Sequence, residues 1–173
     1  LYGDLTFGYK SIASVNVTLR NDWSSTFLKD NRSYLYNAIA ASLNITELFP
    51  TIKNDVIDNI KIRGNVATVG KAGTDFVYGT DSYFVGASSS DGFGPVVCFP
   101  YNGLQGFTLS NTAGNSALGP EFTTNKEIAA EFSLFKSRLT FEGTLYQQKS
   151  RDLIFSVPVS GASGITSVTQ NAG

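Results

Sequence analysis

The chain has 173 residues and a formal net charge of −1, so no basic field is present that would attract nucleic acid. Aromatic residues make up 13% of the chain and charged residues only 16%, which is below the roughly 25% of ordinary soluble domains. The absence of histidine excludes Ser-His-Asp catalysis, Cys-His catalysis and zinc sites with histidine ligands.

Two short alternating runs open the chain and predict a β-hairpin. In residues 5–9 the side chains of Leu5, Phe7 and Tyr9 fall on one face of a strand. Residues 14–20 alternate in the same way, with Val15, Val17 and Leu19 opposite Asn16, Thr18 and Arg20. A tight turn at residues 10–11 would connect the two runs.

A polar loop is expected at residues 21–34, followed by a strand at residues 35–46. The alternation of Ala41, Leu43 and Ile45 with polar neighbours favours the strand. Residues 34–43 also permit a helix, because alanine and leucine are good helix formers.

The run at residues 60–66 carries its charges on one side only. Ile60, Ile62 and Val66 share one face, and Lys61, Arg63 and Asn65 share the other. Two cations and an amide cannot enter a dry core without partners, so this second face needs water or opposite charges.

Residues 69–122 predict one very long loop that is rich in glycine and serine. Its scattered aromatic residues, which include Tyr78, Tyr83 and Tyr101, suggest that the loop packs against something. A compact soluble domain rarely contains so long a connection.

A second hairpin is predicted near the C-terminus, from strands at residues 127–134 and 139–146 with a turn at 135–137. Glu131 on the first strand and Glu142 on the second lie on the faces opposite the apolar side chains. Residues from 149 onward predict another loop.

Short turns therefore alternate with long loops, and each strand has about the 9 to 11 residues that cross a membrane. This rhythm is typical of an antiparallel transmembrane β-barrel with short periplasmic turns and long extracellular loops. The alternative is a soluble or surface-attached β-sandwich that binds carbohydrate or acts as an adhesin, because sandwich strands also alternate.

Four segments carry combinations of residues that are more specific than alternation. Residues 17–25 read V-T-L-R-N-D-W-S-S, and residues 59–65 read N-I-K-I-R-G-N before V-G-K. Residues 118–127 read L-G-P-E-F-T-T-N-K-E. Residues 150–159 read S-R-D-L-I-F-S-V-P-V, and S-G-I and Q-N-A-G follow.

In this order, the segments resemble those of SusC/RagA-type TonB-dependent transporters. The family's segment A-S-L-R-x-D-G-S-S is similar to residues 17–25, with Trp23 in place of the glycine. Its T-K-D-L-L-x-x-V-P-L-P, S-G-F and Q-N-x-G segments are similar to residues 150–173. The residues between 71 and 117 depart from the family pattern, which leaves the cargo open.

The resemblance implies an all-β fold in which residues 1–173 form about six strands of a plugged barrel of about 22 strands. The sequence lacks methionine and a signal-peptide pattern, so we expect an internal barrel segment without plug or TonB box. The implied partners are a SusD-like surface lipoprotein, the TonB complex acting through the missing N-terminal part, and outer-membrane lipid.

The implied function is import of oligosaccharide or peptide across the outer membrane of a Gram-negative, Bacteroidetes-like bacterium, without enzyme activity or cofactor. Lumen-facing candidates are Arg20, Lys61, Arg63, Glu131 and Glu142. They would line a wet interior, or simply solvate the barrel wall and pair across strands. The loop aromatics Tyr78, Tyr83 and Tyr101 would stack on sugar rings, contact the lid, or pack within their own loop.

Overall fold

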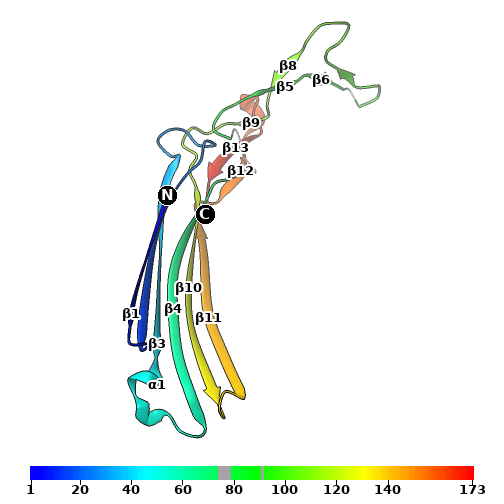
Figure 1. The fold of residues 1–173 in the computed structure, drawn as a ribbon. Coiled ribbons are helices and arrows are strands. Elements are labelled where there is room, and N and C mark those ends of the chain that lie inside the picture. The colour runs from blue at the N-terminus through cyan, green and yellow to red at the C-terminus, as the bar shows by residue number, and fades with distance from the viewer. Residues whose placement is uncertain (74–78, 91) are drawn as a thin grey trace. The chain divides into compact units, whose positions relative to one another are not determined.

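The computed structural model describes residues 1–73, 79–90 and 92–173, and its strands confirm the predicted all-β class (Figure 1). The chain divides into two compact units. The first contains residues 1–23, 33–71 and 121–151, and the second contains residues 24–32, 72–120 and 152–173.

One antiparallel sheet of six long strands forms the first unit (Figure 1). The strand order is β1-β2-β3-β4-β10-β11, so every strand pairs with the next one of this unit along the chain. The strands are β1 (Tyr2–Tyr9), β2 (Ala13–Trp23), β3 (Ser33–Asn44), β4 (Ile57–Lys71), β10 (Glu121–Leu134) and β11 (Leu139–Arg151). This order is that of an up-and-down barrel wall, as predicted.

Both predicted tight turns are present, and left-handed backbone makes them possible. Lys10 and Ser11 have φ values of 44° and 56° between β1 and β2. Phe135, Lys136 and Ser137 have φ values of 55°, 58° and 58° between β10 and β11. Consecutive residues with positive φ reverse the chain within a few residues and match the twist of the flanking strands.

The strand predicted at residues 35–46 ends two residues early, and the alternative helix over 34–43 is wrong. α1 (Ile45–Leu48) and the short helix η1 (Pro50–Ile52) follow β3 directly. The hydroxyl of the buried Thr46 lies 2.8 Å from the side-chain oxygens of both Asn44 and Asn59. These polar contacts turn the chain away from the sheet before its alternating pattern has ended.

The predicted loop at residues 69–122 is shorter than expected, because strands extend into both of its ends. β4 continues to Lys71 and β10 begins at Glu121, and these two residues are cross-strand partners. Pairing with a neighbour thus maintains β structure where alternation in the single chain has stopped.

Small sheets form the second unit, where loops were predicted. One has the order β12-β13-β9, and two others are the pairs β5–β8 and β6–β7. The strands are β5 (Phe84–Gly86), β6 (Ser88–Ser89), β7 (Val97–Cys98), β8 (Phe107–Leu109), β9 (Thr112–Ala113), β12 (Ile154–Pro158) and β13 (Ser167–Asn171). A short helix, η3 (Gly161–Ser163), lies between β12 and β13.

A small core of its own holds the second unit together. Leu118, Phe27 and Ile154 are at most 5% exposed. The Asn171 side chain accepts a hydrogen bond from the Gly119 N–H and donates to the carbonyls of Gly119 and Asp152, at 2.7 to 2.9 Å. This amide therefore fastens β13 to two other segments.

The large sheet, in contrast, has almost no apolar interior. Among the described residues of that unit, Ala129 is the only apolar residue that is buried. A sandwich would bury one whole face of such a sheet against a second sheet. The predicted barrel wall, and not the alternative sandwich, agrees with this arrangement.

Candidate functional site

The two faces of the large sheet differ in chemistry, and the register determines which residues share each face. Leu5 pairs with Val17, Val17 with Ile39, and Ile39 with Val66. On β10 and β11, Ile128 pairs with Leu145 and Phe132 with Phe141. Apolar side chains from all six strands therefore share one face, which we call the apolar face.

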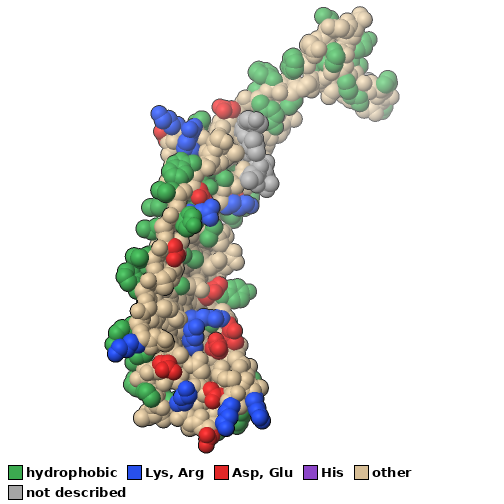
Figure 2. Space-filling model, in the orientation of Figure 1, with side chains coloured by type: hydrophobic (Ala, Val, Ile, Leu, Met, Phe, Trp, Pro, Cys, Tyr) green, Lys and Arg blue, Asp and Glu red, His purple; other side chains and the backbone are tan. Residues whose placement is uncertain are grey.

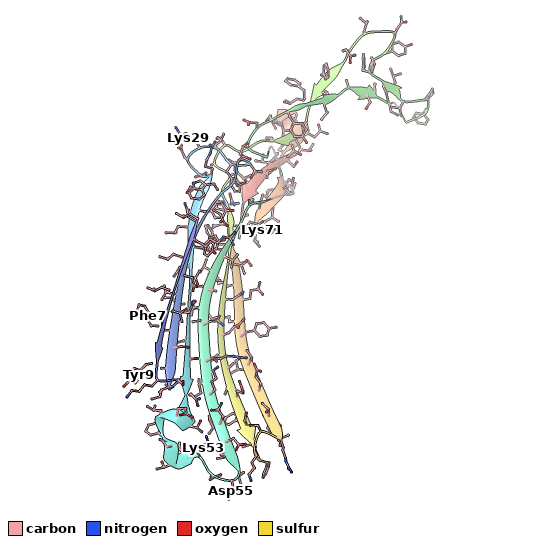
Figure 3. The ribbon with its side chains drawn as sticks, in the orientation of Figure 1. Phe7, Tyr9, Lys29, Lys53, Asp55 and Lys71 are labelled. Atoms are coloured by element: carbon pink, nitrogen blue, oxygen red, sulfur yellow. The ribbon has the colours of Figure 1, made fainter. Side chains whose placement is uncertain are left out.

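Large side chains on the apolar face are exposed. Leu145 is 75% exposed, Phe7 61% and Phe141 57%. Phe7 and Tyr9 project from the same side of β1, away from the sheet (Figure 3). A face of this kind is stable only when a nonpolar surrounding covers it.

The opposite face, which we call the polar face, carries hydrogen-bonding networks that cross the strands. The Asn16 amide donates to both carboxylate oxygens of Asp4 at 3.0 Å and to the Thr6 hydroxyl at 2.8 Å. Asn65 donates to Glu127 from β4 to β10 at 3.0 Å. Charged side chains gather over the lower half of the sheet as drawn in Figure 2.

Four of the five predicted charged residues come together on the polar face of β4, β10 and β11. Lys61 is the cross-strand partner of Glu131, and Glu131 is the partner of Glu142. Arg63 forms an ion pair with Glu142. Since β10 lies between the strands of these two residues, this ion pair crosses it.

A small residue on β10 gives the ion pair room. Ala129 is the cross-strand partner of Arg63 and is only 5% exposed. Its methyl group leaves the space above β10 to the long side chain of Arg63.

The fifth residue, Arg20, lies on the same face but belongs to another cluster. Its Nε donates to Asp22 at 2.9 Å, and its guanidinium lies over the ring of Tyr36, 5.9 Å from the centroid. The Tyr36 hydroxyl donates to the other oxygen of Asp22 at 2.7 Å. Sequence reasoning missed Asp22 and Tyr36, although the i, i+2 spacing of Arg20 and Asp22 is visible.

A polar hollow of about 390 Å³ lies near the β1–β2 turn. Lys61 and Glu131 line it, together with Asn44 and Asn59. Amides and opposite charges can bind water or a polar chain segment there, but they do not form a nucleophile with its base.

The three predicted loop aromatics belong to the second unit. Tyr83 is 51% exposed and Tyr101 is 60% exposed. The backbone of Tyr101 exchanges two hydrogen bonds of 2.9 Å with Leu104, so a tight turn presents its ring. Tyr78 lies outside the described residues.

Within the described ranges, no three residues among cysteine, aspartate and glutamate converge as metal ligands would. No helix found there has the length and hydropathy needed to cross a membrane.

Comparison with protein families gives one match that covers residues 1–173, to the family described as TonB dependent receptor-like, beta-barrel. TonB-dependent receptor P26 of Formosa agariphila is 31% identical over 99% of this chain. TonB-dependent receptor P39 of the same organism is 27% identical over the whole chain. The chain spans only 16% and 15% of the lengths of these two relatives.

Solved structures show the same fold. The RagAB peptide importer in its closed-closed state matches 99% of this chain with a TM-score of 0.81 and 22% identity, over 18% of its own chain. The siderophore receptor PirA of Pseudomonas aeruginosa matches 99% of this chain with a TM-score of 0.58 and 15% identity, over 28% of its own chain.

Proposed function

Because the chain belongs to the TonB-dependent receptor-like β-barrel family, we propose that its six long strands form part of the wall of an outer-membrane importer. The observation that carries this proposal is the exposed apolar face opposite a hydrogen-bonded polar face. Lipid offers no hydrogen-bond partners, so a spanning sheet must satisfy its backbone within a closed barrel and turn its apolar side chains outward.

On this proposal the polar face lines the wet interior of the barrel. Arg20, Lys61, Arg63, Glu131 and Glu142 are then in contact with water, the plug or passing cargo. Support comes from their common face and their opposite-charge pairing across strands. Charged side chains in these positions would keep the lumen hydrated.

The second unit would provide extracellular loops that hold cargo together with a SusD-like lipoprotein. Tyr83 and Tyr101 support this role, because exposed aromatic rings can stack on sugars or cover apolar peptide side chains. TonB would act through a plug and a TonB box located elsewhere in the whole protein. The cargo class is an oligosaccharide or a peptide, and RagAB, with which the chain shares its fold, is named a peptide importer.

Membrane placement is tested by a matched pair of lysine substitutions in the full-length protein. Leu145 lies in the middle of β11 on the apolar face, and its neighbour Thr144 lies on the polar face; both are exposed. We expect Leu145→Lys to destabilise the barrel by about 2–4 kcal/mol in lipid, since an amine near the midplane is costly, whereas Thr144→Lys should change little. The measurement is urea unfolding in vesicles, and equal stabilities would contradict the proposal.

Import itself is tested in cells that lack the full-length gene. Growth on peptides as sole nitrogen source and on oligosaccharides as sole carbon source should separate the two cargo classes. Restoration by the wild-type gene, but not by a form without the TonB box, supports TonB-dependent import. Unchanged growth of the deletion strain on every tested peptide and oligosaccharide would oppose it.

A further inference from the structure

Arg20 is held in one orientation by its neighbours on the polar face. Its Nε donates to Asp22 at 2.9 Å, and its guanidinium lies 5.9 Å from the centroid of the Tyr36 ring. The Tyr36 hydroxyl donates to the second oxygen of Asp22 at 2.7 Å, which connects β3 to β2. A long side chain that is already ordered loses little rotational freedom when it binds a further group.

Most of the hydrogen-bonding capacity of this guanidinium is not used within the sheet. A guanidinium has five N–H donors, and Arg20 uses the single donor on Nε for Asp22. Among the residues that the structure describes, neither Nη atom of Arg20 makes a hydrogen bond or an ion pair, whereas Nη2 of Arg63 is engaged with Glu142. The Arg20 side chain is 55% exposed and that of Asp22 only 25%, so a molecule on the polar face meets the guanidinium first.

The ion pair with Asp22 leaves the binding edge of Arg20 open. Asp22 lies on the Nε side of the guanidinium, and each of its oxygens already accepts one hydrogen bond. The edge formed by Nη1 and Nη2 is a planar fork of two parallel N–H groups, which matches the two oxygens of a carboxylate. The charge of Asp22 weakens the attraction for an anion, but its hydrogen bond fixes the direction of the fork.

Aromatic rings lie beside the guanidinium. Tyr36 is stacked with Tyr34, with ring centroids 6.2 Å apart, and Tyr34 contacts the ring of Phe122 edge-on at 6.4 Å. All three residues are half-buried. Exposed parts of such rings can contact the CH groups of a sugar or the side chains of a peptide while the guanidinium binds a charged group.

Arg20 also lies where cargo would arrive early. It is three residues from the end of β2 at Trp23, and the short turn at Lys10 and Ser11 lies at the other end of this strand. On the proposed function the short turns face the periplasm, so Arg20 is near the outer end of the barrel wall. Imported molecules would therefore pass Arg20 before they reach Lys61.

We propose that Arg20 binds a carboxylate group of the cargo through Nη1 and Nη2, with Asp22 and Tyr36 as positioning residues. A peptide carries such a group at its C-terminus, and an oligosaccharide carries one where it contains a uronic acid. The carboxylate is the chemistry that these two sources share. This inference rests on the proposed function and adds a selectivity to it.

The test compares matched cargo with and without the negative charge, in the deletion strain that carries the full-length gene. One pair is a fluorescent mixture of short peptides without aspartate or glutamate, with either a free C-terminal carboxylate or a C-terminal amide. The second pair is fluorescent oligogalacturonate and its neutral methyl ester. The variant is Arg20→Gln, and the control is Arg138→Gln, which removes the same charge at the turn between β10 and β11.

For at least one pair, we expect wild type to take up the carboxylate form about tenfold faster than the neutral form, as charge-assisted hydrogen bonds would allow. Arg20→Gln should lower this ratio to about one through slower uptake of the carboxylate form alone. Arg20→Lys keeps the charge without the fork, so its ratio should fall between the two. Arg138→Gln should leave the ratio unchanged. Unchanged uptake of the neutral form shows that the variant barrel is folded, because a misfolded barrel would lose both forms.

A wild-type ratio near one for both pairs would overturn the proposal, and so would a ratio that Arg20→Gln leaves intact. The pair that shows the discrimination identifies the source of the carboxylate. Failure of this inference is distinguishable from failure of the proposed function. A barrel that passes the Leu145→Lys test and imports cargo without regard to its carboxylate contradicts the Arg20 site alone, whereas a wild type that imports neither form of either pair opposes the proposed function as well.

Discussion

The ion pair between Arg63 and Glu142 connects two strands that are not neighbours in the sheet. Each side chain is about half exposed, 48% for Arg63 and 47% for Glu142. Exposed pairs contribute about 0.2–1 kcal/mol because water and salt screen them. The ion pair therefore adds little to the stability of the sheet. Its main effects are to hold the two side chains in place and to balance their charges.

A double-mutant cycle with Arg63→Gln and Glu142→Gln in the full-length protein should give a coupling energy of about 0.2–1 kcal/mol. The coupling should fall when unfolding is measured in 1 M instead of 0.05 M NaCl, since the Debye length shrinks to about 3 Å at 1 M. A coupling that is insensitive to salt would mean that the pair is far less hydrated than its exposure indicates.

Gly70 has no room for a side chain, whereas Gly143 has open space. A Cβ atom at Gly70 would lie 2.6 Å from the ring of Tyr34, which itself makes an edge contact with the ring of Phe122. We expect Gly70→Ala to cost about 1–3 kcal/mol, because the packed ring has to move. Gly143→Ala, on β11 where a Cβ atom meets nothing within 4 Å, should be neutral or slightly stabilising. Thermal unfolding of both variants in detergent measures the difference. Equal melting temperatures would show that the Tyr34 ring moves aside without cost and would contradict the prediction.

The hydroxyl of Thr46 holds the short helix α1 against the neighbouring strands. Thr46 is only 2% exposed and contacts both Asn44 and Asn59, so it links α1 to β3 and β4. Thr46→Val keeps the shape but removes the buried hydroxyl that donates to the half-buried side-chain oxygens of Asn44 and Asn59, which should cost about 1–3 kcal/mol. Thr51→Val, on the exposed η1, is the control and should change the unfolding free energy by less than about 0.5 kcal/mol. Urea unfolding of the two variants compares them, and equal losses would contradict the role of Thr46.

The faces of long strands were predictable from sequence, because each has enough positions for a period of two to be visible. Ile60, Ile62, Lys61 and Arg63 lie on the faces that alternation assigned to them. Residues 67–71 were missed as strand, since Thr68 and Gly70 interrupt the apolar alternation and only pairing with β10 keeps them extended. Strands of two to five residues, such as β6 and β12, are too short for any period to appear.

Pairing within the candidate site was less predictable than its faces. That Lys61 faces Glu131, and that Arg63 reaches Glu142, depends on the register between strands 60 to 80 residues apart in the chain. A single sequence contains alternation but not register. The proximity of Lys126 and Lys149 was missed for the same reason, because these residues come together only when β10 and β11 are aligned.

For the whole molecule, the exposed apolar face predicts how residues 1–173 behave alone. Expressed without the rest of its barrel, this segment should aggregate when it is diluted from urea into buffer, because one face is nonpolar and both β1 and β11 are edge strands. Detergent should reduce the aggregation. Light scattering and gel filtration provide the measurement, and a monomer that unfolds cooperatively in plain buffer would support a soluble fold instead.

The crossing of Arg63 and Glu142 over β10 has an evolutionary consequence. A bulky side chain in place of Ala129 would stand in the path of the guanidinium and separate the two charges. Positions 63, 129 and 142 should therefore covary among relatives: where the charges persist, the residue between them stays small, and where it grows, the charges disappear together. Substitutions at these three positions, which lie on three different strands, would then occur together.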